Sequence, residues 1–311
     1  MVRVLVAGEA LIDMYPAEEA DRLADVERYA RRAGGAPANV AVGLAALDER
    51  PWLWTRVGAD PFGEHLRETL AAFDVPDRFV SVDPDRSTAH TIVGTDESGD
   101  PVFQFYQAET ATMCPDPATV TDAALAEIEW LHVGGVWLAD ETARAALLDV
   151  IDRADCPISF DPNTRPDLWD SEAEIEPTVS AALEAVDVVK IGAGDLPWLA
   201  AEDPIRVAER VRGYGPHTVF VTRGAEEAIA ASDGRAPWGP AEHRVTPPTV
   251  EAVDPTGAGD AFTAGAIAHL VAGDDLASAL QYGATVGALA TTEQGAMAAI
   301  PDRETVAQYL E

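Results

Sequence analysis

One stretch of the chain combines residue types that suit the handling of a charged phosphate group. Residues 249–270 read TVEAVDPTGAGDAFTAGAIAHL, an extended run that ends at Asp254 and small residues that predict a helix after Asp260. Gly257 and Gly259 carry no Cβ, so successive backbone N–H groups can turn toward one anion at the positive end of the helix dipole. A carboxylate at Asp260 can accept the proton of a hydroxyl that attacks a phosphoryl group. The pattern therefore predicts phosphoryl transfer.

The alternative is structural: Asp260 caps the helix, and the glycines only form a turn. The same four letters, GAGD, occur at 192–195, where they lead into Leu196, Pro197 and Trp198. This bulky, proline-broken continuation does not suit a tightly packed anion-binding helix. The tetrapeptide alone therefore decides nothing, and the longer string DPTGAGDAFTAG carries the prediction.

That longer string resembles the second signature of the ribokinase-like (PfkB) carbohydrate kinases. The resemblance implies that Asp260 is the catalytic base. It also implies that the amides of Gly257, Ala258 and Gly259 form the anion hole for the transferring phosphate. Residues 34–41, GGAPANVA, resemble the first signature of the same family in its fructokinase-like form.

In this first signature, Gly34 and Gly35 let a sugar lie against the backbone, and Asn39 can both donate to and accept from hydroxyl groups. Residues 8–13, GEALID, resemble the opening strand of the family, and this resemblance assigns Asp13 to sugar binding. Considered alone, the glycines and Asn39 suit a structural helix entry, and Asp13 suits a surface turn. The two signatures in the family's order favour the functional interpretation.

Two further segments resemble the family on the side of the phosphates and the nucleotide. Residues 161–169, DPNTRPDLW, match a segment in which Arg165 stabilises phosphate or contacts substrate through its planar fork. Thr222 and Gly224 match the loop that approaches ATP, and Lys190 stands where members carry a lysine near the nucleotide phosphates. Taken singly, a surface arginine and a solvent-facing lysine at a strand end explain two of these residues equally well.

The resemblance implies ATP as the phosphoryl donor, with Mg²⁺ bound to the ATP phosphates and keeping several waters. The side-chain pair with which relatives hold the metal is poorly matched, so no metal-ligating residue is assigned, although Asp195 can replace the acid of that pair. Residues 293–296, EQGA, correspond to a loop where relatives form an adenine wall and a monovalent cation site from backbone carbonyls. K⁺ therefore joins the expected cofactors.

The apolar runs predict an α/β fold with a mostly parallel sheet and helices on both faces. Strands are expected at 2–7, 52–57, 130–133, 158–160, 186–191 and 218–222, a weaker hairpin at 229–245, and helices at 36–47, 60–73, 141–154, 173–185, 204–212 and 276–292. Between 77 and 107 the period changes to alternation, which predicts an inserted hairpin. We expect one ribokinase-like domain over residues 1–311, with a small β lid formed by insertions around 14–33 and 86–108.

Composition narrows the classes of partner. The chain has 54 acidic and 21 basic residues, a net charge of −33, so its surface repels nucleic acid and anionic membranes. Cys114 and Cys156 suggest neither a disulfide framework nor a zinc site. The chain starts with a strand pattern instead of a signal peptide, and no apolar run approaches transmembrane length. We therefore expect a cytoplasmic protein whose partners are a small sugar and ATP.

Fructose is the expected sugar, because the first signature and the segment 161–169 have fructokinase-like spellings. The closest competitor is 2-keto-3-deoxygluconate, whose kinases use a lid arginine for the substrate carboxylate. Gln107 stands in that lid segment here, although Arg165 remains available, and nucleoside kinases are a third option. From another class, the chain could be a catalytically silent sugar-binding regulator, but the intact base and glycines argue against it. Lid strands in relatives pair into dimers, so a homodimer through the lid is expected.

The excess of acidic residues predicts dependence on salt. Self-repulsion among these carboxylates strains the compact state, and molar salt shortens the Debye length to about 3 Å and screens the repulsion. Our hypothesis is that the protein comes from a salt-rich cytoplasm. The midpoint of thermal unfolding, measured from low to molar KCl, should rise. A midpoint that falls with KCl would reject the hypothesis.

Overall fold

The computed structural model describes residues 4–18, 22–95, 101–192 and 194–310. Its main sheet contains strands β1 (Val4–Ala7), β4 (Trp52–Gly58), β5 (Val80–Asp83), β8 (Trp130–Gly134), β9 (Ile158–Asp161), β10 (Val188–Gly192), β11 (Thr218–Thr222), β12 (Ala228–Ser232) and β13 (Ala241–Val245). Their order is β13-β12-β11-β10-β9-β8-β1-β4-β5. Neighbours are parallel from β11 through β5, whereas β12 and β13 are added antiparallel at one edge.

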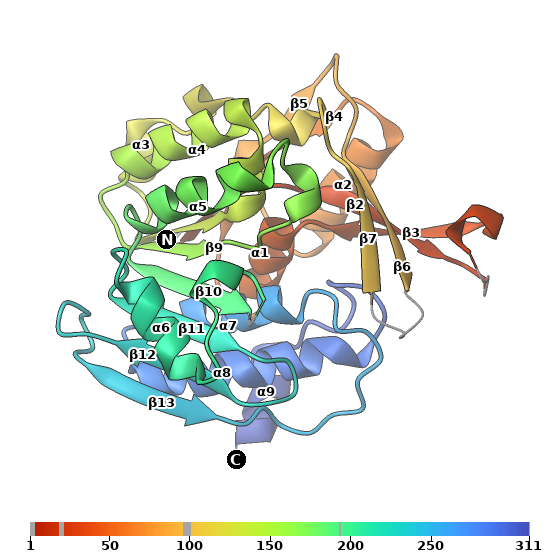
Figure 1. Cartoon of the computed structure of the whole chain (residues 1–311). Coiled ribbons are helices and arrows are strands. Elements are labelled where there is room, and N and C mark those ends of the chain that lie inside the picture. The colour runs from red at the N-terminus through yellow and green to blue at the C-terminus, as the bar shows by residue number, and fades with distance from the viewer. Residues whose placement is uncertain (1–3, 19–21, 96–100, 193, 311) are drawn as a thin grey trace.

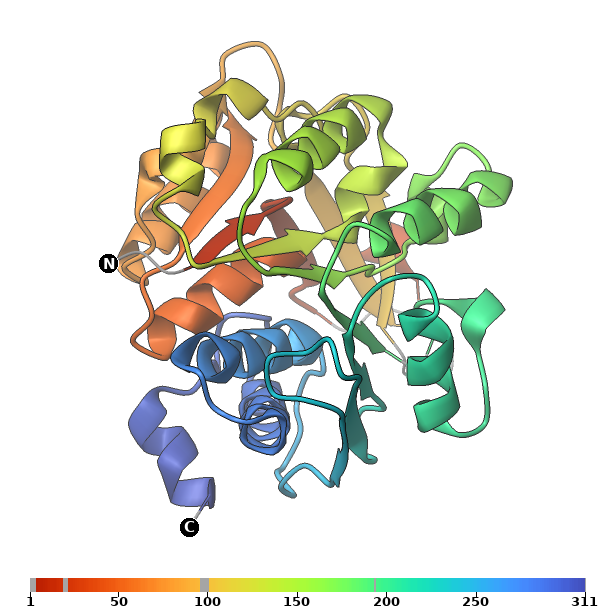
Figure 2. The same cartoon turned by 90° about the vertical axis from the view of Figure 1, so that its left-hand side faces the viewer.

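Helices cover both faces of this sheet (Figures 1 and 2). One face carries α1 (Ala36–Ala46), α2 (Pro61–Ala72), α7 (Ala258–Ala272), α8 (Leu276–Leu289) and α9 (Arg303–Leu310), and the other carries α3 (Asp122–Leu125), α4 (Glu141–Arg153), α5 (Ile175–Leu183) and α6 (Pro204–Arg212). Alternate residues of β1 pack against the two helix layers, because successive side chains of a strand point to opposite faces of the sheet. Val4 and Val6 join the first layer, and Leu5 and Ala7 join the second.

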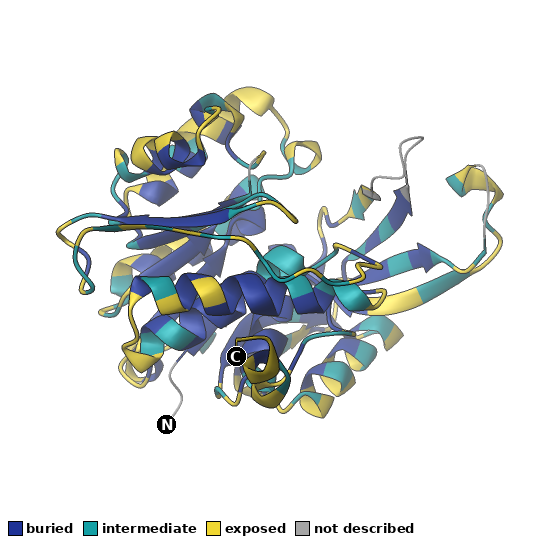
Figure 3. Ribbon diagram, turned by 90° about the horizontal axis from the view of Figure 1, so that it is seen from below, coloured by how far each residue is buried: buried dark blue, intermediate teal, exposed yellow. Residues whose placement is uncertain are grey.

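A separate four-stranded sheet stands beside the main one. It contains β2 (Leu11–Pro16), β3 (Tyr29–Gly34), β6 (His90–Thr95) and β7 (Pro101–Tyr106), in the order β3-β2-β6-β7. Segments from either side of α1 and α2 thus lie together, with β2 and β6 parallel and the outer pairs antiparallel. Figure 3 shows that the end of this small sheet near residues 22–25 is largely exposed.

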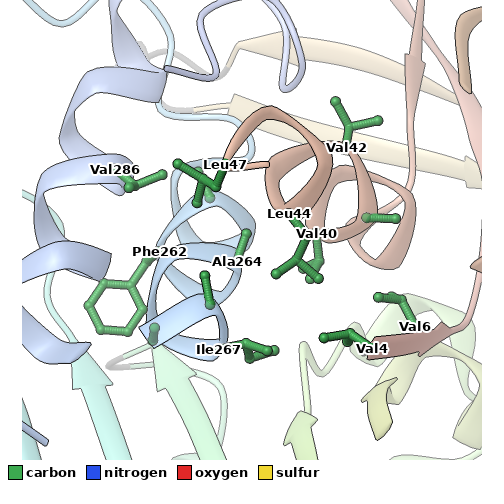
Figure 4. Packing of buried hydrophobic residues seen from close by; sticks show 14 of the residues in the cluster. Val4, Val6, Val40, Val42, Leu44, Leu47, Phe262, Ala264, Ile267 and Val286 are labelled. Carbon is green, nitrogen blue, oxygen red and sulfur yellow. The ribbon is translucent and has the colours of Figure 1, made fainter. Parts of the chain in front are cut away.

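Helices α1 and α7 pack closely on the first face (Figure 4). Gly35, at φ 100°, precedes α1, and Pro37 fits the first turn because its missing N–H has no intrahelical partner there. A Cβ on Gly43 would lie 2.7 Å from the Cβ of Ala264 in α7. The contact of small residues brings the two helix axes close, and it positions the amino-terminal turns that carry polar side chains.

The expected fold class is confirmed, and most predicted strands and helices form within two residues of their expected limits. One strand within 77–107 was not predicted: β5, which precedes the insertion around 86–108, is a parallel edge strand of the main sheet. Its two end residues are buried and the two between them are more exposed, so the short run shows no periodicity that would mark a strand of the main sheet. Most of the predicted hairpin turn, residues 96–100, lies outside the described residues.

The terminal helix α9 was not predicted, because its eight residues follow a proline and contribute one buried side chain, Val306. Within the described ranges, no helix combines the length and apolar character needed to cross a lipid bilayer.

The close contact of α1 with α7 gives a stability prediction. Gly43→Val should lower the free energy of unfolding by about 1–3 kcal/mol, because the added methyl groups force the two helices apart. Gly234→Val is the matched control, since no atom lies within 4 Å of a Cβ at that exposed turn. Denaturant unfolding of both variants checks this. Equal stabilities would show that the helix contact is not tightly packed.

Candidate active site

A cavity of about 340 Å³ lies at the carboxyl ends of the parallel strands, beside the small sheet. Ligands of open α/β sheets commonly bind at this edge, where the strand order reverses about β1. Of the residues singled out from the sequence, Asp13, Gly35, Asn39, Arg165, Lys190, Gly257, Gly259 and Asp260 line the cavity. Residues distant in the chain are therefore brought together as expected.

Asp260 lies in the first turn of α7 and faces the cavity. The Nδ2 group of Asn39, on α1, donates to Asp260 Oδ2 over 2.7 Å. Burial raises the pKa of Asp260 to about 7; the hydrogen bond from Asn39 opposes this rise, the charge of Asp161 adds to it, and Lys190 also opposes it. A carboxylate that titrates near neutral pH suits the exchange of a proton with a hydroxyl group.

The turn before α7 is held by the side chain of Asp254. Its Oδ1 accepts from the N–H of Thr256 over 2.9 Å, and its Oδ2 accepts from the N–H of Gly295 over 2.9 Å. Gly257 adopts φ 79°, and a Cβ there would collide with Ala296. Glycine is therefore required at 257 both for the left-handed backbone and for the close approach of the 295–296 loop.

The expected trio of amides at this turn needs a correction. The N–H of Ala258 donates to the carbonyl of Pro255 over 3.1 Å, because residues 255–258 close a β-turn. It is thus already engaged in this structure, whereas Gly257 and Gly259 line the cavity. A Cβ on Gly259 would lie 2.6 Å from Lys190 Nζ, so an ammonium group stands directly beside the turn.

Lys190, the only lysine of the chain, is held inside the site by acids. Its Nζ donates to Asp161 Oδ2 over 3.0 Å, and its side chain is 11% exposed. Burial alone would lower the pKa of Lys190, but the charges of Asp161, Asp195 and Asp260 raise it above its ordinary value. The group therefore remains a cation that can contact an anionic ligand.

Asp195 belongs to the first GAGD segment, in which Gly194 and Asp195 lie in a turn that starts no α-helix. Its Oδ2 accepts from the N–H of Gly192 over 2.7 Å. Burial and the neighbouring Asp161 raise the pKa of its carboxyl group. The identical letters at 257–260 start a fifteen-residue helix, so the sequence contrast between the two segments is confirmed.

The other side of the cavity offers groups suited to hydroxyls. A Cβ on Gly34 would overlap the Asp13 carboxylate, so glycine there makes room for that side chain. Burial, together with the charges of Asp260 and Asp254, raises the pKa of Asp13 to about 7. The buried oxygens Asn39 Oδ1, Thr91 Oγ1 and Gln107 Oε1 have no hydrogen-bond partner in the described part of the chain, and all three residues line the cavity.

Thr222 and Gly224 lie at the neighbouring strand end and do not line this cavity. Thr222 pairs in register with Gly192, which does line it, and Gly224 has open space around its Cα at φ 59°. Sequence reasoning missed Glu9 and Thr91. Both are buried polar residues on strands or just after them. Such residues indicate a site only once the strands that lie next to them in the fold are known.

Comparison with known proteins shows the family of this chain. A model described as pfkB family carbohydrate kinase matches residues 1–303. The chain belongs to this family. A fructokinase of Klebsiella pneumoniae is 35% identical, and the alignment covers 99% of each protein. This membership shows that the protein is an ATP-dependent sugar kinase.

Solved structures of pfkB-type proteins share the fold over the whole chain. A double mutant of fructokinase from Vibrio cholerae O395, in a fructose, ADP and potassium ion bound form, has a TM-score of 0.87 at 30% identity, covering 100% of this chain and 99% of that one. Fructokinase from Xylella fastidiosa with bound ATP has a TM-score of 0.87 at 28% identity, covering 99% and 98%.

The raised pKa of Asp260 gives a prediction with two readouts. Asp260→Asn should lower kcat by about 10²–10⁴-fold, because no base remains to take the hydroxyl proton. The variant should also be about 1–4 kcal/mol more stable than the parent at pH 8. In the folded state the Asp260 carboxyl keeps its proton up to about pH 7, whereas in the unfolded chain it loses the proton at lower pH. The parent is therefore destabilised as pH rises, and the asparagine variant, which does not titrate, is not.

Chemical unfolding at pH 5 and pH 8 checks the stability difference, which should shrink at the lower pH. Asp152→Asn is the control, because it removes one exposed charge from the acidic surface without touching the cavity. A variant with near-parental turnover, or one no more stable than the control at pH 8, contradicts the assignment of Asp260.

Proposed function

We propose that this protein is an ATP-dependent fructokinase that phosphorylates a primary hydroxyl of fructose. The observation that carries the proposal is the buried Asp260 carboxyl, titrating near neutral pH beside a glycine turn and an ammonium group. The fructokinases that resemble the chain over its whole length supply the choice of sugar.

In the proposed mechanism, Asp13, Gly35, Asn39 and Arg165 hold the sugar, and Gly34 leaves room for Asp13. Asp260 takes the proton of the primary hydroxyl as its oxygen forms a bond to the γ-phosphorus. The bond from that phosphorus to the bridging oxygen breaks in line, and its electron pair leaves with ADP. ATP, with Mg²⁺ on its phosphates, supplies the phosphoryl group.

The anionic side of the site has separate roles. The amides of Gly257 and Gly259 face the transferring phosphate, and Lys190 neutralises the charge that develops on its oxygens. Thr222 and Gly224 approach the nucleotide from the adjacent strand end. Mg²⁺ is held mainly by the ATP phosphates and keeps several waters. K⁺ near the 293–296 loop is part of the same proposal.

The small sheet is proposed to act as the lid of the site, formed by insertions around 14–33 and 86–108. Phe103 and Phe105 line the cavity from β7, and an apolar cover over the reacting groups excludes the water that otherwise hydrolyses ATP. Val102 and Tyr106 are 46% and 43% exposed on the same strand. We propose that this surface pairs two copies of the chain, and sedimentation equilibrium would reveal a monomer if it does not.

The proposal includes the cellular environment of the enzyme and the substrate that competes with fructose. The protein functions in a cytoplasm, where ATP is supplied, and its charge of −33 suits one rich in salt. Arg165 lines the cavity, so an acid sugar such as 2-keto-3-deoxygluconate is the alternative substrate to exclude.

A coupled assay of ADP release, run in molar KCl with fructose, glucose, ribose and 2-keto-3-deoxygluconate, tests the substrate. The kcat/KM for fructose should exceed that of each other sugar by at least tenfold, because Gln107 stands where relatives that bind acid sugars use arginine. A higher kcat/KM for 2-keto-3-deoxygluconate would transfer the proposal to that substrate. No ADP release with any sugar would support a silent regulator.

A further inference from the structure

Glu9 is a buried acid inside the cavity to which the preceding mechanism gives no role. It follows β1 at the carboxyl edge of the main sheet, and it is 2% exposed. Its side chain lines the cavity together with Asn39, Arg165 and Asp260. A buried ionisable group needs partners for its polar atoms, so the contacts of its two oxygens are informative.

Only one of these two oxygens is engaged within the protein. Glu9 Oε1 accepts from the N–H of Ala36, the first residue of α1, over 3.1 Å. Glu9 Oε2 is fully buried and has no hydrogen-bond partner among the described residues. Gly134 lies beside Oε2, since a Cβ built on this glycine would be 3.7 Å from that oxygen.

The surrounding charges favour the neutral form of this side chain. Burial raises the pKa of Glu9 to about 8, and its backbone hydrogen bonds oppose the rise. The Asp260 charge on α7 raises the pKa further, and Arg165, after β9, lowers it. The other charged groups that line the cavity are Asp13 on β2, Asp161 on β9, Lys190 on β10 and Asp195 after β10. At neutral pH, Glu9 is therefore mainly a carboxylic acid, which carries one O–H donor.

Such a donor complements the acceptors that lie near it. Asn39 Nδ2 already donates to Asp260, and the Asn39 atom without a partner is an acceptor oxygen. Asp13 is an acceptor when it is ionised, and Gln107 Oε1 is an acceptor as well. A sugar presents oxygens that accept as well as hydroxyls that donate, so a protonated Glu9 adds a donor to those that Arg165 and the Thr91 hydroxyl bring to the cavity.

We propose that Glu9 contacts the sugar directly, with its Oε2–H group donating a hydrogen bond to a sugar oxygen while Oε1 accepts from Ala36. The side chain thereby couples the position of the sugar to the start of α1, the helix that carries Asn39. This inference rests on the proposed function, because it assigns the residue to the sugar side of that site.

Three variants separate this role from a purely structural one. Glu9→Gln keeps an acceptor for Ala36 and a donor toward the sugar but does not titrate. Glu9→Leu keeps the size and removes both polar atoms. Asp83→Asn is the matched control, because Asp83 is also 2% exposed but pairs with Arg56 and Arg86 away from the cavity. Fructose affinity is measured by calorimetry between pH 6 and pH 9.5 in molar KCl. ADP affinity of each protein and phosphorylation of fructose by the parent are measured at pH 7.

The parent should bind fructose at least tenfold more weakly at pH 9.5 than at pH 7, since ionised Glu9 cannot donate. Glu9→Gln should stay within threefold of the parent at pH 7 and lack this weakening, while Asp83→Asn keeps it. Glu9→Leu should lose at least tenfold in fructose affinity at pH 7 with ADP affinity unchanged.

Three outcomes overturn the inference: a parental affinity that is flat to pH 9.5, a Glu9→Gln profile that follows the parent, or normal fructose binding by Glu9→Leu. If Glu9→Leu does not fold, the comparison of the parent with Glu9→Gln still decides. A parent that neither binds nor phosphorylates fructose overturns the proposed function, and Glu9 with it. A parent that phosphorylates fructose with a flat pH profile overturns only the role of Glu9.

Discussion

The site depends on one hydrogen bond between residues 221 positions apart, from Asn39 on α1 to Asp260 on α7. It forms only because α1 and α7 pack closely through Gly43 and Ala264. Burial makes the Asp260 carboxylate costly to ionise, and the hydrogen bond from the Asn39 amide to one of its oxygens limits that cost. The apolar core between the two helices thus sets both the position and the basicity of the proposed base.

An acidic cavity that binds a polyanion raises an electrostatic question. Glu9, Asp13 and Asp260 have pKa values of about 7 or 8, so part of their charge is neutralised by protons near neutral pH. Lys190 supplies a permanent positive charge at the glycine turn, where the anion is expected. The repulsion that remains between these carboxylates and a bound anion is therefore confined to the cavity and is reduced by partial protonation. On the outer surface, in contrast, exposed acids stay charged and mobile ions screen them.

How much the sequence could predict varies with the kind of evidence. The βαβ rhythm predicted the fold class, and the two glycine segments predicted the part of the cavity lining that includes Gly35, Asn39 and Asp260, because these patterns are local in the chain. The loss of the Ala258 amide to the Pro255 carbonyl was not predictable, since two turn conformations suit the same letters. Glu9 was missed because its meaning comes from Gly134 and Ala36, which lie on other elements and reach it only in the folded chain.

The position of the single lysine has a chemical consequence. Reagents that acylate amines find one side chain in the whole sequence, and it lies in the cavity, paired with Asp161. All surface cations are arginine or histidine, apart from the chain terminus, so acylation leaves the outer charge pattern almost unchanged. The rate at which Lys190 is labelled therefore reports whether the cavity is open or filled, without any engineered probe.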